Sequence, residues 1–442
     1  MVVILLLTSA LLILVDQLLH RNICSPITVF CGLWAVISLL ASLRLFGFDG
    51  FDENAINLVL LGVLGFGAGC LLVEALYSRS AANKAVGTDI RPDDPLFNMG
   101  LLRAILFLVC VGQLISLLTT LVSFSQGATY VDVRGARLGY SDDQYFSNPI
   151  ISAYVNYFCG PALGMLIPVA IVLWFAGKHR KFCCVVLLCA VSGVVSSGGR
   201  ITLVYLAIQL VAALLFFRIK VSAKVKRRVF IAVATGAVAV VGLTVMRSGT
   251  SFLESAYSYF AVPIGLLSSF TEYVDATGFV SFIGAFLYPL FYVANAVTGA
   301  FGIEIEYLDE LVYYVALPQE TWVGGLFPGR SYNAFASLFY YFYLDLREPG
   351  VIIFSFVYGA MMAVAYRKSF INRSLSWMVW YLLALQSMFG SFIIWQLGGT
   401  KFFVSLLLLF LVQRRFHGEK TSQTSSRITV NRKGRQMIGR IQ

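Results

Sequence analysis

Residues 56–77 read INLVLLGVLGFGAGCLLVEALY, and this run decides the fold class because it carries a single charge, at Glu74. A helix of roughly 20 apolar residues crosses a hydrocarbon layer of about 30 Å. The run therefore predicts a membrane-spanning helix. Its glycines recur at the spacing of small residues in tightly packed helices, and we expect them to form a close helix-packing face: Gly62, Gly65, Gly67 and Gly69.

Similar runs recur along the whole chain of 442 residues, of which 59% are hydrophobic and 12% charged. Ordinary soluble proteins are roughly a quarter charged. We place spans near 1–19, 26–47, 56–77, 102–124, 150–176, 182–197, 201–217, 229–246, 350–366, 374–394 and 398–413. The sequence thus predicts an all-α integral membrane protein, a polytopic bundle of about 11 to 13 transmembrane helices. Residues 1–413 would form one membrane domain, and 414–442 a basic tail predicted to be disordered.

Orientation follows from the basic residues, which gather in a few segments: Lys178–Lys181, Arg218–Arg228, Arg367–Arg373 and the tail from Arg414. The positive-inside rule makes these segments cytoplasmic, with the amino terminus outside and the carboxyl terminus inside. The net charge of +11 is then a consequence of topology, and no nucleic-acid partner is expected.

The same orientation places Arg247 and Pro349 outside, so the region between them contains either no crossing or two. Its apolar stretches, 252–270 and 279–301, are interrupted or flanked by acids and prolines. We therefore favour re-entrant or interfacial helices over a full transmembrane hairpin. The long external loops are then about 125–149 and 247–348.

Several classes of chemistry are excluded by what the sequence lacks. The eight cysteines lie within or at the ends of predicted spans without a C-x-x-C pair, which argues against a disulfide framework or a zinc site. His20, His179 and His417 all fall on the cytoplasmic side, so an outer-face Ser-His-Asp triad or histidine metal site is not expected. No nucleotide-binding glycine motif is present. We expect neither a metal nor a cofactor.

Arginines on the outer face stand where the positive-inside rule disfavours them. A guanidinium can bind two oxygens of a phosphate at once, so these arginines are candidate diphosphate ligands, with pairing to outer-face acids as the simpler alternative. Arg200 and Arg247 each adjoin a membrane-embedded helix end, and we expect them to approach each other. The full set is Arg134, Arg137, Arg200, Arg247, Arg330 and Arg347.

The 247–348 loop is rich in aromatic residues. Tyr257, Trp322 and Tyr332 are candidate platforms for sugar rings, whose C–H faces stack on aromatic planes. An interfacial aromatic belt is the alternative.

Three features together resemble the Wzy-type polymerases, which join lipid-linked oligosaccharide repeat units into O-antigen, capsule or exopolysaccharide. They are the SSGGR turn at 196–200, Arg247 at the outer end of a helix, and the segment FPGRSYNAFASLFYYFYLDLREPGVIIFSFVYGAMMAVAYR from Phe327 to Arg367. In that family a similar segment ends the large external loop and leads into a helix with small residues such as Gly350 and Gly359.

The resemblance implies a metal-independent glycosyltransferase of GT-C-like architecture in the bacterial cytoplasmic membrane. Its donor would be a sugar chain on undecaprenyl diphosphate, and its acceptor the hydroxyl of a second lipid-linked unit. Membrane lipids and a chain-length regulator protein are the further partners it suggests. Arginines would hold the departing diphosphate, and a carboxylate would take the acceptor proton.

That proton acceptor must be an outer-face carboxylate, because no histidine is expected there and tyrosine is a poor base at neutral pH. The candidates are Glu254, Glu320 and Asp345, each with a structural salt bridge as its alternative. Two other functions remain open. An O-antigen ligase uses the same donor but typically needs an outer-loop histidine. A lipid-linked sugar flippase would place charges in mid-span, where this chain has little beyond Asp16 and Glu74.

Overall fold

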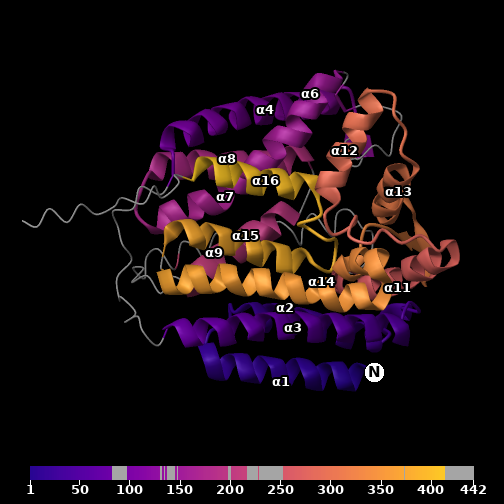
Figure 1. Ribbon diagram of the computed structural model, residues 1–442. Coiled ribbons are helices and arrows are strands. Elements are labelled where there is room, and N and C mark those ends of the chain that lie inside the picture. Colours follow the sequence, from indigo (N-terminus) through magenta and orange to yellow (C-terminus); the bar gives the residue numbers. More distant parts are fainter. Residues whose placement is uncertain are drawn as a thin grey trace, which may run out of the picture.

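The computed structural model describes residues 1–81, 97–129, 132–133, 135–136, 145–146, 148–197, 201–216, 227, 252–372 and 374–413. This part of the chain is mostly helical, with one two-stranded sheet (Figure 1). The predicted diphosphate ligands Arg134, Arg137, Arg200 and Arg247 lie outside the described residues, as does the predicted span 229–246.

The first half of the chain supplies α1 (Val2–His20), α2 (Pro26–Ser42), η1 (Leu45–Gly47), α3 (Glu53–Ala81), α4 (Met99–Ser125), α6 (Pro149–Ala153), η2 (Tyr154–Cys159), α7 (Gly160–Phe175), α8 (Arg180–Ser197) and α9 (Ile201–Phe216). The second half supplies α11 (Phe252–Thr277), α12 (Tyr288–Ala300), α13 (Glu306–Glu320), β1 (Val323–Phe327), β2 (Arg330–Tyr332), α14 (Ser337–Asn372), α15 (Leu375–Gly390) and α16 (Thr400–Val412).

Among the described residues, five helical segments are long and apolar enough to cross a membrane: Val2–His20, Glu53–Tyr77, Met99–Ser125, Pro149–Phe175 and Ser337–Ser369. Shorter apolar helices include α2, α15 and α16. Every predicted span inside the described ranges coincides with a helix. The prediction of an all-α membrane protein is therefore confirmed, while the total number of crossings stays a prediction.

The outer surface of α1 shows why a bilayer is needed. One side of this helix exposes 57–74% of each of five large apolar side chains. Such a continuous apolar stripe is stable only when another apolar phase covers it. The stripe is Val3, Leu7, Leu11, Leu14 and Leu18.

α3 and α14 pack on each other more extensively than any other pair of described helices. Glycines set their separation. A Cβ added to Gly65 would lie 2.6 Å from the backbone oxygen of Ile352, and one added to Gly69 would overlap the backbone of Phe356. Gly359 of α14 lies equally close to the α3 backbone. The two backbones therefore touch along this seam, as in membrane helix pairs built from small residues.

The predicted glycine face is thus confirmed for Gly62, Gly65 and Gly69, which all face α14. Gly67 points the other way, toward the side chain of Leu12 in α1. Each residue of a helix advances by about 100°, so a glycine two positions from its neighbours lies on the opposite face.

α14 is not one straight helix. Its backbone leaves helical geometry at Leu346 and Arg347, two residues before Pro349. The predicted span 350–366 corresponds to the part after this break, and the part from Ser337 to Asp345 precedes it. A proline cannot continue the hydrogen-bond ladder of the preceding turn, which explains why the helix breaks here.

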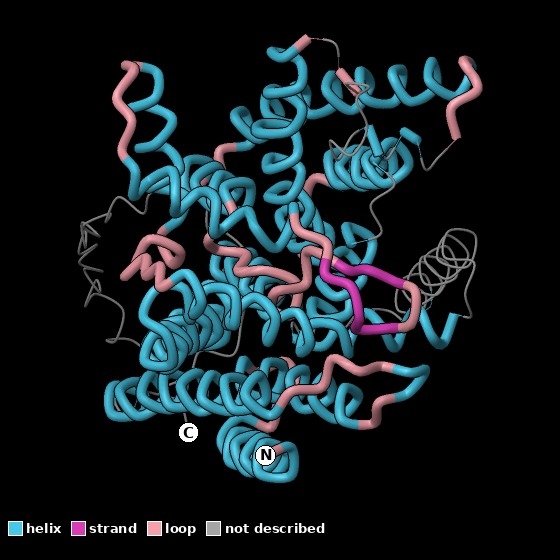
Figure 2. Tube along the Cα trace, turned by 90° about the vertical axis from the view of Figure 1, so that its right-hand side faces the viewer, coloured by secondary structure: helices cyan, strands magenta, loops and turns pink. Residues whose placement is uncertain are grey.

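One end of the bundle collects α11, α12, α13 and the β1–β2 hairpin; Figure 2 looks onto this end. The Tyr257 hydroxyl of α11 donates to the Leu40 carbonyl at the end of α2 (2.9 Å). The Asp49 amide donates to the Leu326 carbonyl of the hairpin (3.0 Å). α11 lacks the apolarity of the five spanning segments. The prediction of non-spanning helices in this region agrees with this lower apolarity, while the parity of crossings stays a prediction.

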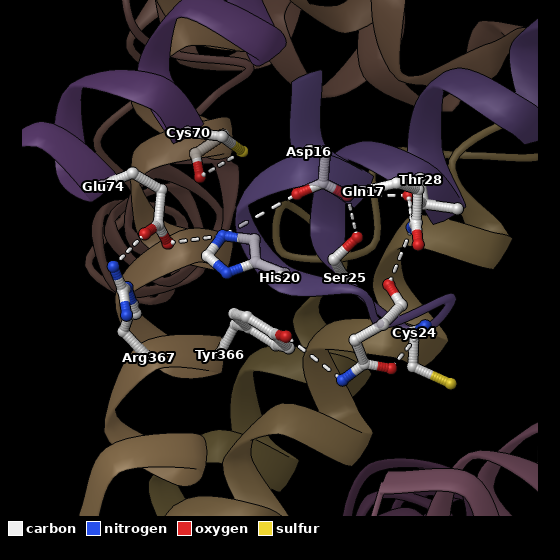
Figure 3. Close-up of polar contacts among 12 residues, drawn as sticks. Asp16, Gln17, His20, Cys24, Ser25, Thr28, Cys70, Glu74, Tyr366 and Arg367 are labelled. Carbon is white, nitrogen blue, oxygen red and sulfur yellow. Dashed lines mark hydrogen bonds and ion pairs between the residues drawn. The ribbon is translucent and has the colours of Figure 1, made fainter. Parts of the chain in front are cut away.

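The opposite end of the bundle holds a buried polar cluster, shown in Figure 3. The Nε2 atom of His20 lies 3.2 Å from Glu74 Oε1 and 3.8 Å from Asp16 Oδ1. The other Glu74 oxygen pairs with Arg367 of α14. Buried charges are tolerated only when they are paired. This cluster therefore fixes α1 and α3 against α14.

Asp16 extends the cluster to α2. Its Oδ2 atom accepts hydrogen bonds from the hydroxyls of Ser25 and Thr28, the second at 2.7 Å. The helix that exposes its apolar stripe to lipid is thereby held to the bundle by polar contacts at one end.

The glycine seam gives a first prediction. Gly69→Ala and Gly359→Ala should each lower the free energy of unfolding by roughly 1–3 kcal/mol, because the added methyl group forces two touching backbones apart. Gly299→Ala is the control, since a Cβ at this helical position meets nothing within 4 Å. Thermal unfolding of the three variants in one detergent decides the matter. Equal unfolding temperatures would contradict the role of the seam.

The polar cluster gives a second prediction. Glu74→Gln removes the carboxylate between His20 and Arg367 and should lower the free energy of unfolding by roughly 3–5 kcal/mol, because the Arg367 guanidinium, only 16% exposed, loses its ion partner. Glu310→Gln, on the exposed surface of α13, is the matched control. Thermal unfolding in detergent, without chemical denaturant, measures the stability of both variants. An unfolding temperature of Glu74→Gln equal to that of the unaltered protein would show that the ion pair is not needed.

Candidate functional site

The β1–β2 hairpin is antiparallel, with Val323 opposite Tyr332, and it turns at Gly329. Gly329 has φ +68°, a backbone conformation that residues other than glycine rarely adopt. This tight turn places Arg330 at the start of β2, directly beside the first turn of α11.

Arg330 and Glu254 form an ion pair of 2.7 Å between Nη2 and Oε1. A hydrogen bond to Tyr332 and the charge of Glu254 both raise the pKa of Arg330, so its guanidinium stays charged. Both side chains remain partly exposed, at 33% and 21%. The pair brings together two predicted site residues that are far apart in the sequence. It also engages Glu254, which leaves this carboxylate less free to act as a base.

A cavity of about 460 Å³ lies beside Arg330. Its walls are the hairpin together with Gly47 of η1 and Asp49 of the loop before α3. The volume falls within the range of small-ligand sites, and Gly324, Gly325 and Gly329 line the cavity together with Arg330. Arg330 is the predicted diphosphate ligand that the described residues place on a cavity wall.

The three predicted sugar platforms differ in what they can offer. Tyr257 is buried, its hydroxyl also accepts from the Leu45 amide (3.0 Å), and its ring packs against Phe327. We therefore assign Tyr257 to packing. Trp322 is 56% exposed, between α13 and β1, and Tyr332 is half-buried in the hairpin. These two rings retain surface on which a sugar could stack.

Glu320 is the last residue of α13 and is exposed. Within the described residues it has no ion partner within 4.0 Å. A carboxylate at the carboxyl end of a helix opposes the helix dipole, at a cost of about 0.3–1 kcal/mol. Stability therefore does not explain a glutamate at this position.

Tyr288 of α12 lies near enough to Glu320 to be affected by its charge. Burial raises the pKa of the Tyr288 hydroxyl, and Tyr292, Tyr157 and Glu320 raise it further. This hydroxyl consequently stays neutral and remains a hydrogen-bond donor. The Tyr341 hydroxyl approaches from α14 and bonds to the neighbouring Gln319 side chain. The arrangement combines one free carboxylate with several phenol hydroxyls, groups suited to binding a polyol.

Tyr157 reaches this group from η2, a π-helical turn inside the Pro149–Phe175 segment. Pro161 has no N–H to donate to the carbonyl of Tyr157 four residues earlier, which loosens the helix here. π-Turns inside α-helices occur frequently at functional sites. Tyr157 is 50% exposed, and its hydroxyl interacts with that of Tyr292. The Pro149–Phe175 segment and α12 therefore meet at these two side chains.

Asp345 lies elsewhere and is fully buried. Its carboxylate accepts hydrogen bonds from Ser281 Oγ (2.6 Å), the Ala285 amide (2.8 Å) and the Phe286 amide (2.9 Å). All three donors belong to the segment before α12. The geometry favours an anchoring role for Asp345 over the predicted role as a proton acceptor, because no reactant can reach it.

Arg347 occupies the break in α14 with φ 59° and ψ −143°. Such a backbone conformation costs about 1–3 kcal/mol in a residue other than glycine. Its side chain bonds to the Val274 carbonyl (3.1 Å) and Asp275 (3.3 Å) at the end of α11, and lies over the Tyr343 ring. Its Nη1 atom is buried without a hydrogen-bond partner among the described residues. Strain of this kind is typical of functional sites.

Arg330 and Arg347 do not share one site. Their partners Glu254 and Asp275 stand at opposite ends of α11, roughly 30 Å apart by the rise of an α-helix. The Glu320 group is nearer the hairpin, since the Asn333 side chain after β2 donates to the Gln319 carbonyl (2.8 Å). The predicted residues that the structure brings together are therefore Glu254, Arg330 and Tyr332, with Glu320 and Trp322 at the base of the hairpin.

Sequence reasoning missed Tyr157, Tyr288, Tyr292 and Asp275. A signal for two of them was present: Tyr288 and Tyr292 stand four residues apart and share one helix face. The π-turn and the link from Asp275 to Arg347 have no local signature, because each depends on contacts between distant segments.

Within the described residues, no group of three His, Cys, Asp or Glu side chains could hold a metal ion. Comparisons of this chain with protein-family models, with curated proteins and with solved structures gave no match.

The anchoring role of Asp345 can be tested by stability. Asp345→Asn should lower the free energy of unfolding by about 1–3 kcal/mol, because an amide offers one acceptor oxygen to three donors. Asp309→Asn on the exposed face of α13 is the control. If thermal unfolding shows no difference between the two variants, Asp345 does not anchor the segment.

Proposed function

We propose that this protein is a membrane-embedded glycosyltransferase that joins undecaprenyl-diphosphate-linked oligosaccharide repeat units into a polysaccharide. The observation that carries the proposal is Glu320, a free carboxylate beside Tyr288, at the end of the bundle where Arg330 lies on a cavity. Sugar hydroxyls need neutral donors and acceptors, and a lipid diphosphate needs a fixed cation; both are present at this end.

The reaction assigns a role to each group. Glu320 takes the proton of the acceptor hydroxyl, and the acceptor oxygen forms a bond to the anomeric carbon of the donor sugar. The bond between that carbon and the diphosphate oxygen breaks, and the lipid diphosphate leaves with the electron pair. Arg330 neutralises the charge that the leaving group gains. The proton then passes from Glu320 to water, which restores the carboxylate.

The finer architecture belongs to the same proposal. The chain would cross the membrane 11 to 13 times in a GT-C-like arrangement. Among the described residues, the five long segments and four shorter apolar helices would supply nine of these crossings. It would lie in a bacterial cytoplasmic membrane with its carboxyl terminus inside and with the hairpin end outside. A chain-length regulator would be a partner of that outer end.

A transporter of lipid-linked sugars is the second candidate, and one observation favours it. Asp16, His20, Glu74 and Arg367 form a buried ionisable cluster, and chains of such groups in membranes serve proton relays in transporters. The cluster lies at the opposite end of the bundle from Glu320. The two functions therefore predict different sensitive residues.

The proposal is tested with purified protein and lipid-linked repeat units, with polymer ladders as the readout. Glu320→Gln should lower the rate of polymer formation by about 10²–10⁴-fold, the usual contribution of a general base. Glu310→Gln, an exposed glutamate of the same helix, should retain the normal rate.

Full polymer formation by a folded Glu320→Gln variant would remove Glu320 from the reaction. The transporter is the correct function if the unaltered protein joins no repeat units but moves lipid-linked sugars across the membrane of proteoliposomes, and if a Glu74→Gln variant shown to be folded loses that movement.

A further inference from the structure

A groove of about 480 Å³ runs between α14, α15 and α16. α16 packs mainly on α7, and α15 packs on both α7 and α14, which leaves space between α16 and the α14–α15 pair. The groove walls are apolar, with Met361 from α14, Trp380 and Ala384 from α15, and Phe402 from α16. All of these positions lie on helices apolar enough to stand in a membrane.

The groove opens on the surface of the helix bundle. Met361 and Val357 on its rim are 43% and 37% exposed. The hydroxyl of Ser387, which also lines it, is already bonded to the Tyr358 hydroxyl (3.0 Å). The groove thus offers no unsatisfied polar group to a ligand, and its size is that of a small-ligand site. A flexible hydrocarbon chain fits these properties.

One end of the groove carries a cation. Trp377 lines the groove, and the ammonium nitrogen of Lys368 lies 4.3 Å from the centre of its ring. Among the described residues, Lys368 has no carboxylate within 4.0 Å. The adjacent Arg367, in contrast, is paired with Glu74. Lys368 is therefore a charge available to an anion at the rim.

We propose that the groove binds one acyl chain of an anionic phospholipid, with the lipid phosphate held by Lys368. Tryptophan and lysine at the end of a membrane helix are typical of the headgroup level, and basic sites between transmembrane helices bind anionic headgroups. A second copy of this chain would fill the groove but would leave Lys368 without an anion. The lipid-linked substrate carries its diphosphate to Arg330, which lies at the other end of the bundle. The site is thus separate from the proposed reaction.

Tryptophan fluorescence tests the proposal directly, because Trp377 and Trp380 line the groove. The full chain is reconstituted into phosphatidylcholine vesicles that contain a minor fraction of phosphatidylglycerol with brominated acyl chains, since bromine quenches nearby tryptophan. The same measurement follows with the bromine on phosphatidylcholine. The quenching at the groove is the difference between the quenching of the unaltered protein and that of the Trp377→Phe/Trp380→Phe double variant.

The expected result is stronger groove quenching by brominated phosphatidylglycerol. Lys368→Gln should weaken its relative affinity by about fivefold, the value of one basic residue at the headgroup level. Lys181→Gln, an exposed lysine at the start of α8, should leave the affinity unchanged. Ala365→Phe, which fills the groove from α14, should reduce quenching by both lipids while the protein keeps its oligomeric state in size-exclusion chromatography.

Three results would overturn the proposal. Equal quenching by the two brominated lipids would remove the headgroup preference. Equal effects of Lys368→Gln and Lys181→Gln would reduce it to general surface charge. Groove tryptophans that neither lipid quenches would show that protein, not lipid, covers the groove.

Discussion

The contact between α3 and α14 is the constraint on which the rest of this structure depends. Gly65, Gly69 and Gly359 let the two backbones touch, so the helices cannot slide or rotate without a clash. α14 continues from this seam to both ends of the bundle. At one end it carries Arg367 to Glu74, and at the other it carries Asp345 to the segment before α12. A single rigid seam thus positions polar groups that are far apart in space.

The break in α14 connects the seam to the candidate site. The strained backbone at Arg347 separates the part of α14 that packs on Gly65 and Gly69 from the part that contacts α11 and the segment before α12. Asp345 and Tyr343, which precede the break, hold the 281–286 segment and the end of α11 respectively. These contacts fix the ends of α11 and α12, and α12 in turn carries Tyr288. The hydrogen bonds of Tyr343 and Asp345 therefore help to hold the backbone at Arg347 in its strained conformation.

Hydrophobic run length predicted the described helices well, because a membrane imposes one length and one polarity on every crossing. The glycine spacing likewise predicted the seam, since small residues at these intervals have few other uses. The sequence did not predict which side chains of distant segments pair with each other. Glu254 and Arg330 were each predicted as site residues, but nothing local indicated that they bind each other. Asp345 resembled a free outer-face acid, and only the fold shows that three donors enclose it.

The two polar centres of the protein differ in a way that bears on function. At the end of the bundle shown in Figure 3, the carboxylates of Asp16 and Glu74 both have polar partners, which stabilises α1 against the bundle. At the hairpin end, Glu320 is exposed and unpaired within the described residues, and Arg330 lies on a cavity. A paired buried charge resists change, because any loss of its partner is costly. An exposed carboxylate near neutral hydroxyls can instead accept hydrogen bonds from a bound polyol. This asymmetry supports the proposed site at the hairpin end and a structural role for the charges at the other end.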